Sequence, residues 1–264
     1  MNRALLPSLL VLVAAMSSAQ SPLDWPRIGY LVDSGGALRP IHGTTANFIL
    51  GEVLFNGNTS CASSAAGALV KTPEEVILVG ANGETKNRWA APGGDALFAF
   101  HVDGAPALVF YLDGSRLMRV VEDRLEAVPL DMDRLGGAIV AVAAPDGAGA
   151  LLAVARGDEV WLVSLSTESG EVTGERLLAG VTGRVHLAAD GSVLYMENGD
   201  LVCRGMDGAE KRFTLEAEVR SFAPLGSGWV AVSVQHAGAE GLTRYGLRLD
   251  AGREGLYQLP EVAQ

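Results

Sequence analysis

Histidine and aspartate are the residue types in this chain that could carry proton-transfer chemistry. His101 lies in FAFHVD and His186 in RVHLAAD, so each comes shortly before an aspartate, Asp103 or Asp190. An imidazole beside a carboxylate can act as a general base or hold a ligand. Each aspartate stands directly before a glycine, however, and Asp-Gly is typical of tight hairpin turns. The histidines are therefore interpreted either as a channel-lining pair or, the favoured reading, as satisfied residues of the core.

Other signatures of catalysis or of metal binding do not fit. The chain has four histidines and two cysteines, and their spacing matches no zinc site. Asp131 and Asp133 precede a glycine pair in LDMDRLGG, but a calcium loop supplies more oxygen ligands than these two. No serine stands in a Gly-x-Ser-x-Gly elbow, and the glycine pairs open no helix that could hold a phosphate. We predict no catalytic residue, no cofactor and no metal ion, and the pattern leaves open whether the protein is an enzyme.

Turn signals recur along the chain at an almost constant interval. Glycine-centred turns follow one another every 38 to 48 residues, which is the length of one four-stranded blade in a ring of repeats. These turns lie near Gly35, Gly83, Asp123, Gly170, Gly208 and Gly252. A second set falls between them, at Gly67, Gly104, Gly147, Gly191 and Gly228. Each repeat therefore holds two hairpins, which together make a four-stranded sheet.

The two sets of hairpins differ in composition. Hairpins of the first set alternate apolar with polar residues, as in RLMRVV and RLEAVPL, which is typical of half-solvated outer strands. Those of the second set are apolar and rich in alanine, as in AIVAVAA and ALLAVA, which suits inner strands buried on both faces. The count is six outer hairpins, beginning with residues 28–41, and five inner ones. The first repeat is then a partial blade, or residues 44–58 hold strands that the pattern does not separate from loop.

Through these repeats, residues 28–259 resemble the β-propeller superfamily, in particular secreted bacterial members with short WD40-like or YVTN-like blades. The resemblance rests on periodicity and on the hairpin pattern, since no Gly-His or Trp-Asp pair recurs. It implies an all-β fold, a propeller of five to six four-stranded blades with room for one partial blade, and a location outside the cytoplasm. It implies no particular activity.

The first nineteen residues have the pattern of a secretory signal peptide. Arg3 precedes an apolar stretch over residues 4–15, and small residues precede the expected cleavage after Ala19. We expect a short lead over residues 20–27 and a single domain over 28–264, secreted or periplasmic and not inserted in a membrane. The cleaved chain has 19 basic and 31 acidic residues, a net charge near −12. Such a surface repels nucleic acid, which we exclude as a partner.

Two cysteines, Cys61 and Cys203, fall in different repeats. On opposite sides of a ring they would be too far apart for a disulfide, so we expect two separate buried thiols.

Loops at one end of a propeller offer the remaining candidates for function. Connections between blades and between second and third strands lie at one end of the axis, where binding residues concentrate. The predicted binding residues are His42, Asn47, Asp95, Asp113, Asp131, Asp133 and His236. We expect a non-catalytic binding or scaffold module that takes a protein or cell-envelope component on this loop-rich face. The alternatives are a hydrolase or lyase acting on a sugar or lactone in the axial funnel, and a small-molecule or metal sensor.

Overall fold

The computed structural model describes residues 25–260, except residues 46, 123, 146, 148, 182, 227 and 251. The expected signal peptide, residues 1–19, and most of the expected lead lie outside these described residues. In this part of the chain, no helix combines the length and the apolar character that crossing a membrane requires.

The described residues form an all-β fold whose sheets follow the order of the sequence. The first sheet has three strands, β1 (Arg27–Val32), β2 (Leu38–Thr44) and β3 (Asn47–Leu50). Three sheets have four strands each. The first of these contains β8 (Ala96–Phe100), β9 (Pro106–Tyr111), β10 (Arg116–Val121) and β11 (Arg124–Val128), and the second contains β12 (Ala138–Ala143), β13 (Gly149–Arg156), β14 (Glu159–Ser166) and β15 (Val172–Leu177). The third contains β16 (Val185–Leu187), β17 (Val193–Glu197), β18 (Asp200–Arg204) and β19 (Glu210–Thr214). The remaining sheet has eight strands, β20 (Glu218–Gly226), β21 (Trp229–Gln235), β22 (Thr243–Arg248) and β23 (Gly255–Gln258) with β4 (Ser60–Ser64), β5 (Gly67–Lys71), β6 (Glu75–Gly80) and β7 (Thr85–Ala90). One short helix, α1 (Met132–Leu135), precedes β12.

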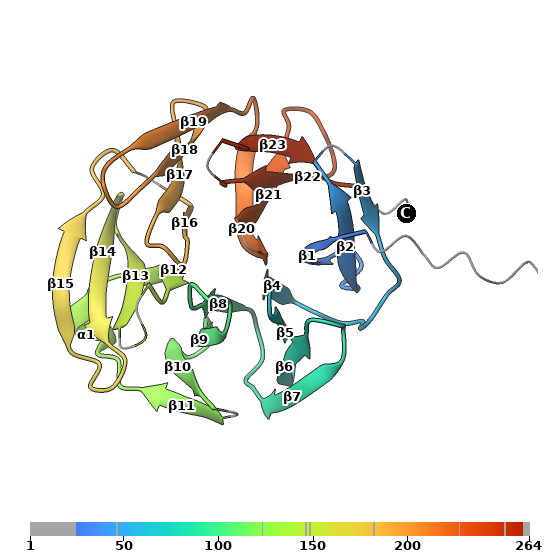
Figure 1. The fold of residues 1–264 in the computed structure, drawn as a ribbon. Helices are drawn as coiled ribbons and strands as arrows, with labels where there is room; N and C mark the ends of the chain where they lie inside the picture. The colour runs from blue at the N-terminus through green and yellow to red at the C-terminus, as the bar shows by residue number, and fades with distance from the viewer. Residues whose placement is uncertain are drawn as a thin grey trace, which may run out of the picture.

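Figure 1 shows these sheets side by side in a ring around a central axis. Five inner strands surround the axis in the described part of the chain, because β4, β8, β12, β16 and β20 each contact the next and β20 contacts β4. β20 and β4 run parallel and pair at Leu225 and Ser63, which joins both groups of four strands into the eight-stranded sheet. The all-β prediction is confirmed. The blade number stays a prediction, because this junction makes one sheet out of two groups of four strands.

The first sheet has no strand of its own at the axis. Its innermost strand, β1, packs over the junction between β4 and β20. Of the two alternatives that the sequence left open, residues 44–58 do contain a strand, because residues 47–50 form the third strand of this sheet, and a partial first blade stays a prediction. The interpretation of residues 28–41 as an outer hairpin is wrong. Tyr30 and Leu31 are 2% and 8% exposed, because Tyr30 packs in a cluster with residues of β5 and β6 and Leu31 in a cluster with residues of β20 and β21.

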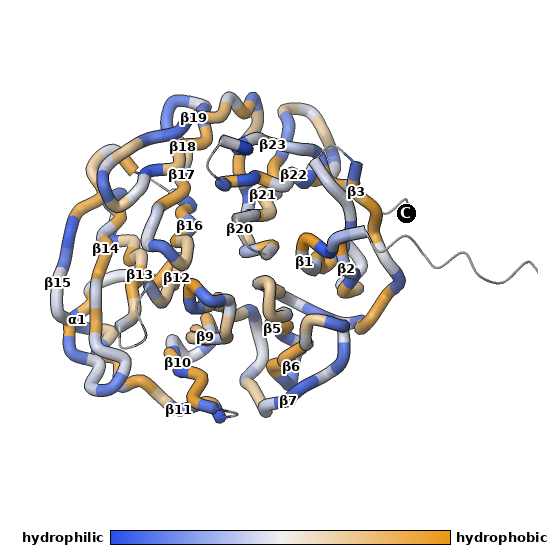
Figure 2. Tube along the Cα trace, in the orientation of Figure 1, coloured by the Kyte–Doolittle hydropathy of each residue, from blue (hydrophilic) through white to orange (hydrophobic). Residues whose placement is uncertain are grey.

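Burial falls from the axis toward the rim of the ring. The second strands β5 and β9 are buried along almost their whole length, whereas the fourth strands β7, β15 and β19 are mainly exposed. Figure 2 shows the same gradient in hydropathy, with hydrophilic residues along the outermost strands. The buried side chains form clusters between adjacent sheets, for example around Leu108 with Leu152 and around Ala153 with Tyr195. Packing between sheets thus fixes the positions of the inner strands.

The inner hairpins turn as their Asp-Gly sequences predict. Gly104 and Gly191 have φ angles of 87° and 81°, a region that favours glycine. Asp103 accepts a hydrogen bond from the Ala105 N–H at 2.9 Å, which stabilises the turn. The third Asp-Gly pair begins at residue 146, outside the described residues.

Candidate functional site

Two cavities lie along the axis of the ring. The beginnings of the inner strands line a cavity of about 580 Å³, which we call the loop-face cavity because the connections between sheets arrive there. The ends of the inner strands and the turns after them line a cavity of about 320 Å³, the turn cavity. Phe98, Val142, His186 and Pro224 line both and so separate one cavity from the other.

The turn cavity is lined by His101 and His186, the two histidines that each precede an aspartate in the sequence. Asp190 lines it as well, whereas Asp103 does not. His186 is also buried, as the favoured core interpretation expects. The His186 ring is buried and lies 6.1 Å from the ring of Phe222. Burial lowers the pKa of His186 to about 4, while the nearby Asp190 opposes this shift. Asp190 itself accepts hydrogen bonds from the N–H and the hydroxyl of Ser192, as in a capped turn.

The chemistry available to His186 is hydrogen bonding more than proton transfer. With a pKa of about 4 the imidazole is neutral at neutral pH. Within the described residues its ring makes no hydrogen bond, so both nitrogens are available to a ligand. A general base is most effective when its pKa lies near the working pH, which this one does not. The lowered pKa therefore counts against His186 as a general base at neutral pH.

The loop-face cavity is more polar than the turn cavity. Charged and amide side chains from separate turns and strands line it, namely Asp33, Asn58, Asp95, Arg184 and Arg244. Because these groups come from different sheets, the closed ring is required to bring them together. Both signs of charge are present, so the cavity suits a ligand with polar groups of more than one kind.

Asn58 is an unusual member of this lining. It is 6% exposed, and its Nδ2 donates to the carbonyl oxygens of Gly36 at 2.8 Å and of Phe55 at 3.1 Å. Its Oδ1 is buried and has no hydrogen-bond partner among the described residues. A buried polar atom without a partner costs about 1–3 kcal/mol and is often found at functional sites. The amide thus locks the turns around the cavity and retains one free acceptor.

Lys71 lies near enough to two of the predicted binding residues, Asp95 and Asp113, to be affected by their charges. It is fully buried at the end of β5, and its Nζ donates to the Thr72 carbonyl. Burial lowers the pKa of Lys71, whereas the carboxylates of Asp95 and Asp113 raise it. Gly94 leaves the space that Asp113 occupies, since an added Cβ would lie 2.5 Å from the Asp113 Oδ2. The sequence analysis missed Lys71, although a lysine that ends an apolar inner strand was a signal for a buried charge.

Asp95 is the one predicted binding residue among those that line the loop-face cavity. His42 lies on β2, with its Nδ1 3.2 Å from the Trp25 carbonyl oxygen. Asn47 begins β3 and is exposed. The Nε2 of His236 lies 3.4 Å from the Tyr245 hydroxyl. These residues are spread over separate elements, and their role in binding stays a prediction.

Asp131 and Asp133 belong to helix α1. Asp131 is its N-cap and accepts a hydrogen bond from the Arg134 N–H at 3.0 Å, while Asp133 lies exposed in the first turn. Gly136 closes the helix with a φ of 64°, which explains why two acidic residues precede glycines in the sequence. Among the described residues, no three His, Cys, Asp or Glu side chains gather in a way that could hold a metal ion.

The two thiols are free, as expected. Cys61 lies on β4 and Cys203 on β18, in different sheets. Burial raises the pKa of Cys61 to about 12 and also raises that of Cys203. Neither thiol is activated as a nucleophile, because the thiolate is the reactive form.

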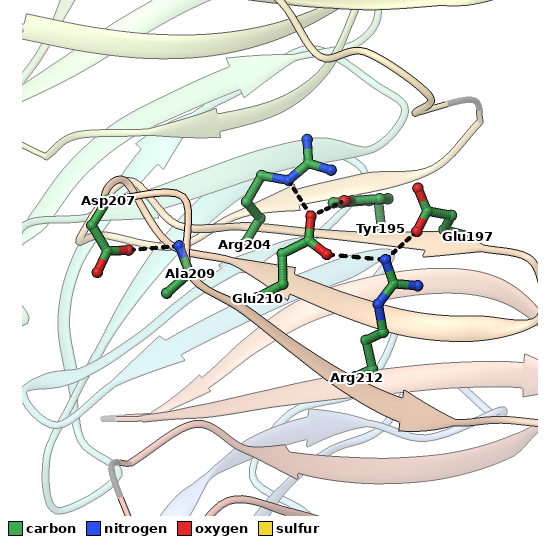
Figure 3. Close-up of polar contacts among 7 residues, drawn as sticks. All are labelled: Tyr195, Glu197, Arg204, Asp207, Ala209, Glu210 and Arg212. Carbon is green, nitrogen blue, oxygen red and sulfur yellow. Dashed lines mark hydrogen bonds and ion pairs between the residues drawn. The ribbon is translucent and has the colours of Figure 1, made fainter.

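A cluster of ion pairs lies on the outer strands of the β16–β19 sheet, away from both cavities (Figure 3). Glu210 accepts hydrogen bonds from Arg204 at 2.8 Å, from Arg212 at 2.9 Å and from the Tyr195 hydroxyl at 3.4 Å. Arg212 also contacts Glu197. The charges neutralise one another and face solvent, so the cluster supports the outer strands and offers no unpaired group to a ligand.

Comparison with known proteins identifies the fold. No protein-family model matches the sequence, and no curated protein matches it either. Among solved structures, TolB from Acinetobacter baumannii is similar over 89% of this chain and 67% of its own, with a TM-score of 0.55 and 14% sequence identity. The fold is a β-propeller.

Two other solved structures resemble this β-propeller more distantly. Hydrazine synthase from Kuenenia stuttgartiensis matches 77% of this chain and 66% of its own, with a TM-score of 0.47 and 13% identity. Virginiamycin B lyase from Staphylococcus aureus matches 92% and 87%, with a TM-score of 0.43 and 12% identity. The chain spans about two thirds of the length of the hydrazine synthase and TolB chains that it matches. At such low identity these similarities concern the fold alone.

Proposed function

We propose that this β-propeller is a non-catalytic binding module that takes a protein or cell-envelope component at its loop-rich face. The loop-face cavity carries the proposal, because its 580 Å³ and its mixed charges can receive a projecting segment of a partner. A propeller ring holds such a cavity rigidly, since each lining group is fixed by packing between sheets. Little conformational entropy is then lost on binding.

The proposed face includes the Lys71, Asp95 and Asp113 cluster. The carboxylates of Asp95 and Asp113 act electrostatically on the buried ammonium group of Lys71 and favour its charged form. Asn58 also lines this cavity, and its buried Oδ1 has no hydrogen-bond partner among the described residues. Export of the chain, to the periplasm or the exterior, belongs to the same proposal and rests on the sequence pattern of residues 1–19.

The ring itself is proposed to count six blades, the first without an inner strand. The eight-stranded sheet then represents two blades, β20–β23 and β4–β7, which touch through one parallel bridge at Leu225 and Ser63. This division keeps the five inner and the last five outer hairpins of the sequence, and the three strands of the first sheet take the place of the first outer hairpin.

Filling the loop-face cavity tests the binding proposal. Ser221 is exposed and lines this cavity, so Ser221→Trp would block it without disturbing the core. Met206 is 61% exposed and lines neither axial cavity, so Met206→Trp adds the same side chain elsewhere. Crosslinking in the producing cell, followed by mass spectrometry, should recover a partner with the wild type and with Met206→Trp but not with Ser221→Trp. Equal recovery with all three proteins would contradict the proposal.

An enzyme acting on a sugar or lactone in the turn cavity is the second candidate. One observation favours it, namely that His101, His186 and Asp190 line the same cavity. The lowered pKa of His186 counts against its use as a base. Turnover of sugar or lactone substrates that His186→Gln abolishes, with the fold retained, would place this candidate first.

A further inference from the structure

Positively charged side chains gather at a third cavity, and neither axial cavity has a comparable group of them. It has a volume of about 460 Å³ and is lined by Arg27, Arg248 and Arg253. No aspartate or glutamate is among the described residues that line it. The whole chain has a net charge of −11, so this gathering of arginines departs from the average surface.

The ion pairs of the three arginines leave a local excess of positive charge. Arg248 donates from Nε and from Nη2 to one carboxylate oxygen of Asp250, each at 2.8 Å. Arg27 donates from Nη1 to the Tyr30 hydroxyl at 2.8 Å, which is a neutral partner. Within the described residues, the guanidinium groups of Arg27 and Arg253 form no ion pair. Two positive charges at this cavity are therefore not neutralised by the protein.

Aromatic rings hold two of these guanidinium groups in place. Arg27 lies over the ring of Tyr30, with its Cζ 4.8 Å from the ring centroid. Arg248 lies over the ring of Trp229 at 5.4 Å. Stacking and hydrogen bonding fix both planes before any ligand arrives, which reduces the entropy lost on binding. Arg253 is exposed and can approach a ligand from solvent.

Hydroxyl groups complete the lining. Thr44 ends β2 and Thr45 follows it, and both line the cavity, whereas the hydroxyl of Ser64 already donates to the Gly104 carbonyl oxygen at 2.6 Å. Guanidinium forks together with hydroxyl donors are the groups that bind phosphate and sulfate in proteins. The cavity is larger than a single phosphate ion needs and lies within the range of small-molecule sites.

We propose that this cavity is a binding site for a tetrahedral oxyanion, the phosphate or sulfate group of a small molecule, with Arg27, Arg248 and Arg253 as its ligands. The site joins the two ends of the described chain, because β1 and β2 belong to the first sheet and Arg248 ends β22. Figure 1 shows the first sheet beside β20–β23. A bound anion therefore ties the first sheet to the last strands and stabilises the closed ring. The proposal does not depend on the proposed function at the loop-face cavity.

Calorimetric titration of the purified protein tests the site, with inorganic phosphate, sulfate and acetate as probes at constant ionic strength in chloride buffer. Phosphate and sulfate should bind saturably with one site per chain and raise the melting temperature, while acetate should bind more weakly. Arg253→Gln should lower phosphate affinity about tenfold or more, because one charged hydrogen-bond donor is lost. Arg253 is exposed, so this variant should fold normally.

Arg176→Gln is the matched control, because Arg176 is also an exposed arginine, on β15, but lines none of the three cavities. It should bind phosphate like the wild type. Absence of saturable binding by phosphate and sulfate, or equal affinities of Arg253→Gln and the wild type, would overturn the proposal. A phosphate monoester that binds more tightly than inorganic phosphate would assign the site to an esterified ligand, and equal binding would assign it to the free anion.

Discussion

The backbone N–H of Tyr30 donates a hydrogen bond to the side-chain oxygen of Ser63 at 3.0 Å. This bond connects β1 to β4 where the first and last parts of the chain meet. Ser63 is 1% exposed, and it lies in the parallel bridge to Leu225 of β20. One small side chain thus satisfies a buried donor of the first sheet at the point where the ring closes.

Ser63→Ala should destabilise the protein by about 1–3 kcal/mol, because the buried Tyr30 N–H loses its acceptor and water has no access to replace it. Ser169→Ala is the control, since the Ser169 hydroxyl accepts a hydrogen bond only in an exposed turn. Urea denaturation gives the free energies of unfolding of both variants. A loss at Ser63 no larger than that at Ser169 would show that the ring closes without this bond.

The approach of β1 to β20 makes a second prediction. A Cβ added at Gly29 would lie 1.4 Å from the carbonyl oxygen of Leu225, and backbone cannot move aside as a side chain can. Gly29→Ala should therefore cost about 3 kcal/mol or more and separate β1 from the inner strands. Hydrogen exchange at the Tyr30 amide should become faster.

Gly174→Ala provides the comparison for Gly29. Gly174 also lies in a strand, β15, but an added Cβ would meet nothing within 4 Å. Replacing it should be neutral or stabilising by up to about 1 kcal/mol, because alanine loses less backbone entropy on folding. Equal effects of the two alanines would mean that the close approach at Gly29 does not limit stability.

The sequence predicted the hairpins because their signals are local. Turn glycines and the two kinds of strand pattern lie within a few residues of one another, so the hairpin repeat could be read directly, whereas the nature of the first unit stayed open. The position of β1 could not be predicted from the sequence, since it depends on Leu225 and Ser63, which are distant from β1 in the chain. The same holds for the site. His186 was found because it lies on an apolar strand, whereas the electrostatic effect of Asp95 and Asp113 on Lys71 depends on how two sheets pack.

The buried His186 makes stability depend on pH. Its pKa is about 4 in the folded protein and 6.5 as the ordinary value. As the pH falls below about 6.5 the unfolded chain binds a proton first, so the free energy of unfolding decreases until the pH reaches about 4. Above that window His186 is neutral in both states and has no effect. The loss on going to pH 5 should be about 2 kcal/mol.

Urea denaturation at pH 7.5 and pH 5.0 measures this loss. His186→Gln should remove most of the pH dependence, because glutamine does not titrate, while His236→Gln should retain it. Carboxylates with lowered pKa values, such as that of Glu254 at about 2, lose their contribution only at lower pH and do not interfere. An unchanged slope in His186→Gln would show that another group causes it.

Lys71 and Asp95 should be energetically coupled. Asp95→Asn should destabilise the protein, because the carboxylate raises the pKa of Lys71 against the effect of burial and so stabilises its charged form. Lys71→Met removes the buried charge with little change in volume and should be neutral or stabilising. In the Lys71→Met background Asp95→Asn should then have a smaller effect, with a coupling of about 0.5–3 kcal/mol.

A double-mutant cycle measured by urea denaturation at neutral pH gives the coupling energy between Lys71 and Asp95, and Asp133→Asn serves as its control. Asp133 is exposed on α1 and is not among the groups that shift the pKa of Lys71, so its effect should add to that of Lys71→Met. If the effect of Asp95→Asn were also additive with that of Lys71→Met, the Asp95 carboxylate would not stabilise the charged form of Lys71. The loop face would then present Asp95 to a partner without the buried lysine holding it, and the proposed rigidity of the loop-face cavity would lose its main support.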